Sequence, residues 1–314
     1  MNNQIKSNIK TPVVVGIGEI LWDMLPSGRQ LGGAPTNFAW FAKTLGAESY
    51  VVSSVGSDSL GRDILARLDK MKISREYISV DRDHPTGVVD VQLDKDGKPA
   101  YDIRRDVAWD FIRFSPELHS LAKRTRAVCF GSLAQRSAVS RRTIRKFVSL
   151  MPASALKVFD VNLRQSFYNR NIIHDLLKLS NVFKLNDDEL VIVADMLSVS
   201  GNEANVVKSL MRRYQLDVVA VTRGGEGSVL YCADGKCVVK GQKIKIVDTV
   251  GAGDSFASAL AVGLVNGVKT EKIIELANRL AAYVCGRHGA TPILSGSMKK
   301  AMGVLCRRTP REII

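Results

Sequence analysis

The chain has 314 residues, of which 46% are hydrophobic, and it carries a formal net charge of +14. This length suits one large α/β domain, and the composition excludes a disordered protein. No apolar run approaches the roughly 18 residues that a membrane-spanning helix needs. The N-terminal stretch "MNNQIKSNIKTP" also lacks the apolar core of a signal peptide. We therefore expect a cytoplasmic protein without a membrane partner.

Strand-like and helix-like runs alternate along most of the chain, which predicts a parallel sheet with helices on both faces. The alternation begins with a strand at 13–18, a helix at 35–46, a strand at 49–56 and a helix at 60–71. It resumes with strands at 127–132, 156–162, 181–186 and 217–224, separated by helical stretches. We expect a single α/β domain over residues 1–314, built on a central, mostly parallel sheet flanked by helices.

Two segments interrupt this alternation. Residues 84–110 have the pattern of two strands around a "KDGK" turn, and residues 19–33 that of an extended pair around Pro26, Ser27 and Gly28. Together they predict a small, discontinuous β-sheet over about residues 19–33 and 84–112. A lid over a cleft would be built in this way.

The basic residues and cysteines suggest no further site. Arginines and lysines cluster in "KRTR" (123–126), "RRTIRK" (141–146) and "CRRTPR" (306–311), but no aromatic residues alternate with them as a base-stacking surface would require. Solvated helix faces explain them better, and we expect no nucleic-acid partner. Five cysteines without a C-x-x-C pair indicate reduced thiols, and four scattered histidines argue against a zinc site.

The stretch "DTVGAGDSF" (248–256) carries the clearest chemistry. We expect a strand at 243–247 before it and a helix at 255–267 after it. A helix N-terminus binds anions, and the Gly-Ala-Gly run lets an anion approach the backbone closely. Asp254 then falls in the first helical turn, where a carboxylate can take a proton from an attacking hydroxyl during phosphoryl transfer. An ordinary tight turn before an acidic first turn fits the spacing equally well.

"DTVGAGDSF" resembles the C-terminal signature of the ribokinase-like sugar kinases, the pfkB carbohydrate kinase family. "LGGAPTNFAWFAKTLGAESYVVSSVGSDSLG" (31–61) resembles the N-terminal signature of the same family. Two distant motifs in the right order are far more specific than either alone. The resemblance implies a ribokinase-like fold with a β-sheet lid, and an ATP-dependent sugar kinase that uses Mg²⁺ and could also bind K⁺. It makes a homodimer through the lid plausible.

The resemblance implies roles for the residues that match these motifs. Asp254 would be the general base that activates the sugar hydroxyl, with an anion hole for the γ-phosphate formed by Gly251, Ala252 and Gly253. The expected sugar-binding residues are Asp23, the hinge glycines Gly32 and Gly33, Asn37, and Arg164. The glycines could instead form a plain turn, and Asn37 could be a buried polar group that the backbone satisfies.

"DVNLR" (160–164) fits a motif that several family members carry after a central strand. Arg164 could reach the transferring phosphate or a substrate anion, and Asp160 and Asn162 could line the cleft.

Other motifs indicate the nucleotide side. "NDDE" (186–189) matches the family's N-x-x-E, so Asn186 and Glu189 would hold the nucleotide and its Mg²⁺, with Glu189 acting through water. The same letters form a capping box. By resemblance, the remaining nucleotide residues are Thr222, Gly224 and Gly227 of "VTRGGEG", for which a hairpin loop is the alternative, and Asn278. Asp248 matches a monovalent-cation position, and a loop role is as good an explanation.

Phosphorylation of a primary hydroxyl of D-fructose is the predicted reaction, because "LGGAPTNFA", "GEILWD" and "VAWD" (107–110) look most like fructokinases. A 2-keto-3-deoxygluconate kinase is the alternative, since Arg104, Arg105 and Arg164 could bind a carboxylate. Another sugar of the family and a catalytically inactive, kinase-like binding protein also remain open. "GIGEIL" (16–21) lacks the third glycine of a dinucleotide fingerprint, and no Walker A motif occurs.

Overall fold

A computed structural model describes residues 11–25, 28–93 and 99–306 of the chain. Its nine-stranded sheet consists of β1 (Val13–Ile17), β4 (Glu48–Gly56), β5 (Ile78–Asp81), β8 (Thr125–Phe130), β9 (Leu156–Asp160), β10 (Val182–Asn186), β11 (Val218–Thr222), β12 (Gly227–Cys232) and β13 (Gly235–Lys240). The order is β13-β12-β11-β10-β9-β8-β1-β4-β5. The strands from β11 to β5 run parallel, and β12 and β13 add an antiparallel edge. The expected parallel sheet is present.

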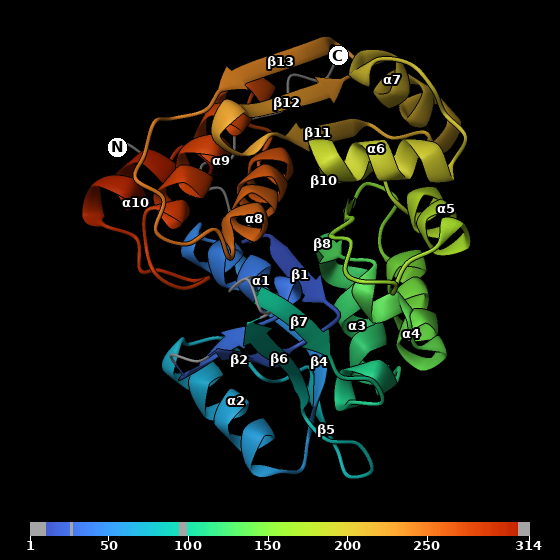
Figure 1. Cartoon of the computed structure of the whole chain (residues 1–314), viewed down its shortest axis with the longest axis vertical. Helices are drawn as coiled ribbons and strands as arrows, with labels where there is room; N and C mark the ends of the chain where they lie inside the picture. The colour runs from blue at the N-terminus through green and yellow to red at the C-terminus, as the bar shows by residue number, and fades with distance from the viewer. Residues whose placement is uncertain (1–10, 26–27, 94–98, 307–314) are drawn as a thin grey trace, which may run out of the picture.

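Helices cover both faces of this sheet because its central strands are apolar on both sides. On β1, Val13, Val15 and Ile17 pack into one core and Val14 into the other. The first core is covered by α3 (Pro116–Arg124), α4 (Ala138–Leu150), α5 (Arg170–Leu179), α6 (Asp187–Met196) and α7 (Glu203–Tyr214). The second is covered by α1 (Ala34–Thr44), α2 (Ser59–Lys70), α8 (Ala252–Val265), α9 (Thr270–Cys285) and α10 (Gly296–Met302) (Figure 1). No helix among the described residues is long and apolar enough to cross a membrane.

A second, four-stranded sheet consists of β2 (Leu21–Leu25), β3 (Gly28–Gly32), β6 (Gly87–Leu93) and β7 (Pro99–Ile103), in the order β3-β2-β6-β7. Each outer pair is antiparallel, as the two extended segments predict, and the central pair β2 and β6 is parallel. The sheet lies beside α2, below β1 and α1 in Figure 1. The predicted turn residues Pro26 and Ser27, and the "KDGK" turn at 95–98, lie outside the described residues.

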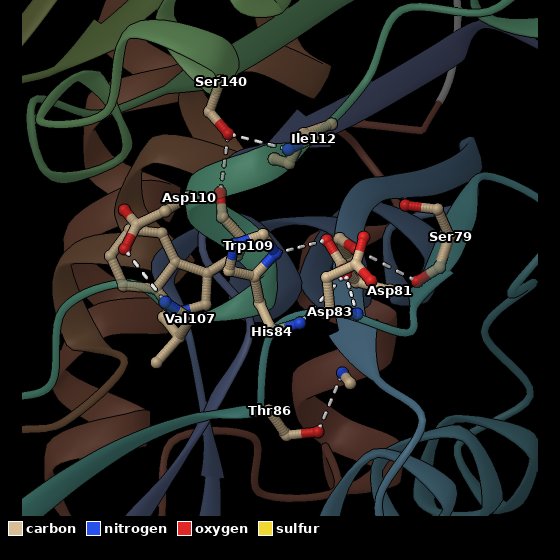
Figure 2. Close-up of polar contacts among 12 residues, drawn as sticks. Ser79, Asp81, Asp83, His84, Thr86, Val107, Trp109, Asp110, Ile112 and Ser140 are labelled. Carbon is tan, nitrogen blue, oxygen red and sulfur yellow. Dashed lines mark hydrogen bonds and ion pairs between the residues drawn. The ribbon is translucent and has the colours of Figure 1, made fainter.

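The chain returns from this small sheet through a short 3-10 helix, η1 (Ala108–Phe111), that is fixed to α4 (Figure 2). The hydroxyl of Ser140 donates to the carbonyl oxygen of Trp109 at 2.7 Å and accepts the N–H of Ile112 at 2.9 Å. His84, just before β6, hydrogen-bonds Asp81 at 3.1 Å and stacks on Phe111. Contacts on both sides therefore hold the junction between the two sheets.

The predicted strand at 243–247 is wrong. Residues between β13 and α8 form no strand, because the backbone N–H groups of Val247 and Asp248 donate to the carbonyl oxygen of Cys285, at 2.8 and 3.2 Å, and not to a neighbouring strand. The Lys-Ile alternation belongs to an exposed segment, in which Ile246 is 62% exposed. The following helix starts at Ala252 and not at Ser255.

The strand order locates a crevice. From β1 the chain moves to β4 on one side, and later returns to the other side of β1 through β8. At the point where the chain stops adding strands on one side of β1 and continues on the other, a crevice opens at the carboxyl ends of the strands. Ligands of open α/β sheets bind in this crevice.

Candidate active site

The N-terminus of α8 lies at this edge of the sheet and depends on glycine. Gly251, its N-cap, has a φ of 80°, and a Cβ at this position would collide with the carbonyl oxygen of Ala290. The N–H of Ala252 donates to the carbonyl oxygen of Thr249 at 3.3 Å. Gly251 and Gly253 have N–H groups without a hydrogen bond to the described part of the chain. Of the three predicted anion-hole residues, these two can offer donors to an anion.

Asp254 lies in the first turn of α8, as predicted, and it contacts the N-terminal motif directly. The Nδ2 of Asn37, a buried residue of α1, donates to its Oδ2 at 2.8 Å. Burial raises the pKa of Asp254, although the Asn37 hydrogen bond and the charges of Lys184 and Arg164 oppose this rise. A carboxylate with a raised pKa is a better proton acceptor than one in water.

A buried ion pair lies beside the anion-binding turn. Lys184 on β10 donates to both carboxylate oxygens of Asp160 on β9, at 3.0 Å each, and the two side chains are 8% and 6% exposed. A Cβ on Gly253 would lie 2.9 Å from the Nζ of Lys184, so the ammonium group is next to the first turn of α8. Burial raises the pKa of Asp160 to about 6, against the opposing charge of Lys184.

Lys184 itself keeps its charge. Burial alone would lower its pKa, but the carboxylates of Asp160 and Glu189 outweigh burial and hold the pKa above its usual value. Sequence reasoning expected Asp160 to line the cleft and missed Lys184. The sequence feature that could have identified Lys184 is its position within the otherwise apolar strand β10, because a buried charged residue needs a partner.

Arg164 follows β9 on the exposed side of the site. Its charge opposes the rise in the pKa values of Asp254, Asp23 and Glu19, so the guanidinium is near enough to act on all three carboxyl groups. Burial nonetheless raises the pKa of Asp23 to about 6 and that of Glu19 to about 7. The structure thus brings Asp23, Asn37, Arg164 and Asp254 together. Sequence reasoning did not assign Glu19, which lies two residues after the end of β1.

The two predicted hinge glycines contact these acidic residues. A Cβ on Gly32 would collide with the carboxylate of Asp23. Gly33 is the N-cap of α1 with a φ of 108°, and a Cβ there would lie 2.5 Å from the carbonyl oxygen of Glu19. Both glycines are therefore required by close local packing, whether or not this segment also moves.

Asn186 and Glu189 form the capping box that their spacing predicts. The N–H of Glu189 donates to Asn186 Oδ1 at 2.7 Å, and the N–H of Asn186 donates to Glu189 Oε2 at 2.9 Å. Glu189 Oε1 also accepts the N–H of Leu163 at 3.0 Å. Each carboxylate oxygen of Glu189 thus has one N–H donor and keeps a lone pair for a water molecule.

The other predicted nucleotide residues lie on β11, on the turn and strand that follow it, and on α9. Thr222 pairs with Asn186 across β11 and β10, so both lie at the same sheet edge. Gly224 has a φ of 50° and open space around it, whereas a Cβ on Gly227 would collide with the carbonyl oxygen of Val239. Packing against β13 therefore explains Gly227 without a ligand. Asn278 of α9 donates to Ser228 Oγ at 2.6 Å.

Asp248 ties two loops together. Its Oδ1 accepts the N–H of Val250 at 3.0 Å, and its Oδ2 accepts the N–H of Gly289 at 3.0 Å. Ala290, the next residue, contacts Gly251 as described above. Asp248 thus holds loop backbone in place, which is the alternative that sequence reasoning weighed against cation binding. It supports the turn that precedes α8.

A carboxylate in the first turn of an anion-binding helix, with a buried ammonium group beside that turn, suits phosphoryl transfer to a hydroxyl group. A model of the family described as pfkB family carbohydrate kinase matches residues 28–295. The chain belongs to this family, and it is a sugar kinase.

Among its relatives, the putative sugar kinase PH1459 of Pyrococcus horikoshii is 28% identical over 302 residues, which cover 90% of this chain and 93% of that protein. A crystal structure of PH1459 in complex with ATP has a TM-score of 0.75 at 26% identity, covering 92% of this chain and 99% of that one. A probable fructokinase-5 of Arabidopsis thaliana is 29% identical over 310 residues, 90% of this chain and 94% of the relative.

The crystal structure of a Xylella fastidiosa fructokinase with bound ATP has a TM-score of 0.80 at 22% identity, covering 92% of this chain and 97% of that one, and it supports the fold alone. The ribokinase-like fold and the family membership, both predicted from two motifs, are confirmed. The roles of individual residues remain predictions.

Proposed function

We propose that this sugar kinase transfers the γ-phosphoryl group of ATP to a primary hydroxyl of D-fructose. The hydrogen bond between Asn37 and Asp254 carries the proposal, because it joins the N-terminal signature to the expected base at the anion-binding turn. ATP as donor is supported by the ATP complex of PH1459, and fructose by the fructokinase relative of Arabidopsis at 29% identity.

In the proposed reaction Asp254 accepts the proton of the attacking hydroxyl. Its raised pKa favours this step, and the N-terminus of α8 beside it faces the transferring group. The N–H groups of Gly251 and Gly253, on either side of Ala252, would stabilise negative charge on the γ-phosphoryl oxygens. Lys184 adds a fixed positive charge next to the same turn, and Arg164 adds one on the exposed side.

The nucleotide would lie across the ends of β10 and β11, near Asn186, Thr222, Gly224 and Asn278. Within the described residues, no group of three or more His, Cys, Asp or Glu side chains could hold a metal ion by itself. A Mg²⁺ ion fits if phosphate oxygens and water supply most of its ligands, with Glu189 contacting it through water. When bound, Mg²⁺ neutralises charge on the phosphates.

The arginines favour fructose over 2-keto-3-deoxygluconate. Arg104 pairs with Asp90 of the small sheet at 2.8 Å, and Arg105 stacks over Phe167. Of the three candidate carboxylate ligands, this leaves Arg164, which already lies among carboxyl groups. A neutral sugar therefore suits this site better than a sugar acid.

Three predictions extend the proposal. The small sheet, as part of a discontinuous lid over about 19–33 and 84–112, would close over the sugar and exclude water, which would otherwise compete as acceptor. Its edge strands β3 and β7 could pair with a second copy in a homodimer. Asp248 could support a K⁺ site. Size-exclusion chromatography and activity with and without K⁺ test the last two.

The decisive experiment measures ATP consumption with Mg²⁺ and D-fructose, 2-keto-3-deoxygluconate, ribose or no sugar, beside an Asp254→Asn control. Turnover with fructose alone and a silent control would support the proposal. Turnover only with the keto acid would keep the mechanism and replace the substrate. Silence with every sugar would favour an untested acceptor or a non-catalytic protein.

A further inference from the structure

One oxygen of the Glu19 carboxyl group, Oε2, lacks a structural partner in the described part of the chain. Glu19 is 3% exposed, and its Oε2 has no hydrogen-bond partner among the described residues. The same holds for Oδ1 of Asn37, whose Nδ2 is bonded to Asp254. Buried polar atoms are normally hydrogen-bonded, and an unpartnered one costs free energy. Two such oxygens at one site indicate a ligand with hydroxyl groups.

Glu19 lies near the proposed base, Asp254. It comes between β1 and β2, and its backbone contacts Gly33 at the start of α1. Its pKa responds to the charges of Asp254 on α8 and Arg164 after β9, and to hydrogen bonds from the backbone N–H groups of Glu19 itself and Ala34. Its carboxyl group therefore shares the space between the N-termini of α1 and α8 with the proposed base.

The charges around this space disfavour a sugar that itself carries an anionic group. Glu19, Asp23 and Asp254 contribute three carboxyl groups, and Arg164 is the cation among them. The ammonium group of Lys184 is already paired with Asp160. A carboxylate or phosphate on the sugar would be repelled, whereas hydroxyl groups can donate hydrogen bonds to carboxylates.

We propose that Glu19 is a second carboxyl group that binds the acceptor, hydrogen-bonding a sugar hydroxyl through its unpartnered oxygen, and that it restricts the acceptor to neutral, polyhydroxylated sugars. The inference rests on the proposed sugar kinase reaction and deepens it. It assigns a residue to sugar recognition and a chemical class to the substrate, independently of which neutral sugar is used.

The test compares the wild type with Glu19→Ala and Glu19→Gln. Loss of one hydrogen bond to a carboxylate should raise KM for the sugar roughly tenfold in Glu19→Ala, with an intermediate value in Glu19→Gln. KM for ATP should change less than twofold. Glu48→Gln is a matched control, because Glu48 begins β4 at the opposite edge of the sheet and pairs with Arg124; its KM values should equal those of the wild type.

Deoxy sugars distinguish a direct contact from a structural effect. Fructose analogues that each lack one non-reacting hydroxyl are compared as kcat/KM in the wild type and Glu19→Ala. If Glu19 binds one hydroxyl, removing that hydroxyl costs roughly tenfold in the wild type and almost nothing in the variant. Equal losses in both enzymes for every analogue would overturn the proposal. If Glu19→Ala does not fold, Glu19→Gln replaces it in the comparison, and the loss on removing that hydroxyl should then be smaller than in the wild type, because the amide oxygen is a weaker acceptor.

Failure of the fructose assignment is distinguishable from failure of this inference. Wild-type turnover with another neutral sugar would replace fructose, and the Glu19 variants are then tested with that sugar. Turnover only with 2-keto-3-deoxygluconate or a sugar phosphate would overturn the neutral class. If nothing turns over, calorimetric binding of the same sugars to wild type and variant decides, and absence of binding by any neutral sugar overturns both proposals.

Discussion

Asn37 donates a hydrogen bond of 2.8 Å to Asp254, a residue 217 positions further along the chain. The bond joins the first turn of α8 to α1, which packs beside it. Each residue belongs to a motif at one end of the sequence, so the site exists only when both ends of the chain have docked on the same face of the sheet.

Replacement of Asp254 by Asn should abolish most turnover. General bases typically contribute about 10²–10⁴-fold, so kcat should fall by at least 100-fold. The fold should survive, because the amide keeps the shape and can still hydrogen-bond Asn37. Single-turnover kinetics and a thermal unfolding curve measure the two effects. Residual activity above a tenth of wild type would show that another group accepts the proton.

Asn37→Asp should shift the pH profile of the reaction. A second carboxylate in place of the Nδ2 donor would raise the pKa of Asp254 further, because like charges disfavour ionisation. The base must be deprotonated, so activity is lost as the pH falls through this pKa, and the acid limb of kcat should move to higher pH in the variant. Asn37→Ala is the comparison, since it removes the hydrogen bond without adding charge. An unchanged acid limb in both would mean that Asp254 does not control it.

Lys184→Met should destabilise the protein by about 3–5 kcal/mol, because it leaves the carboxylate of Asp160 buried without its partner. Adding Asp160→Asn should restore much of this loss. Denaturant unfolding of both single variants and the double variant completes the cycle. Additive losses would show that the pair does not act as a unit.

The two glycines before Asp254 should respond differently to alanine. Gly251→Ala forces a side chain into a φ of 80° and against the carbonyl of Ala290, so both stability and activity should fall. In Gly253→Ala the Cβ would lie 2.9 Å from the Nζ of Lys184, which a small shift of that side chain can relieve, so activity should fall with less loss of stability than in Gly251→Ala. Thermal unfolding beside kcat tests this, and a similar drop in unfolding temperature for both would refute it.

Glu19→Gln should make the sugar-free protein more stable, with a definite pH dependence. The pKa of Glu19 rises from 4.5 to about 7 in the folded chain, so its ionisation opposes folding. The neutral carboxyl group stabilises the folded chain relative to the ionised one. This contribution to the free energy of unfolding is complete below pH 4.5 and is lost as the pH rises through about 7. The variant should therefore gain on the wild type by up to roughly 3 kcal/mol between these values and hold that gain above pH 7. Denaturant unfolding at pH 5 and pH 8 measures it, and an equal difference at both would contradict the shifted pKa.

Much of the architecture could be predicted from local patterns. Alternating apolar runs predict the parallel sheet, and the two extended segments predict the small sheet, because periodicity depends on near neighbours. The same reasoning failed at 243–247, because this segment has an alternating pattern but no neighbouring strand with which it pairs. The capping box of Asn186 and Glu189 was also readable from spacing, because both partners lie within one helical turn.

The sequence by itself determined the layered α/β architecture, the family and the position of Asp254 in the first turn of a helix, since each depends on residues close together in the chain. Only the tertiary structure decided that Lys184 lies next to Gly253, that Glu19 shares the site of the base, and that the expected glycine at 227 serves the packing of β13. Contacts and pKa shifts of this kind arise from burial and from the meeting of distant strand ends, and no local pattern records them.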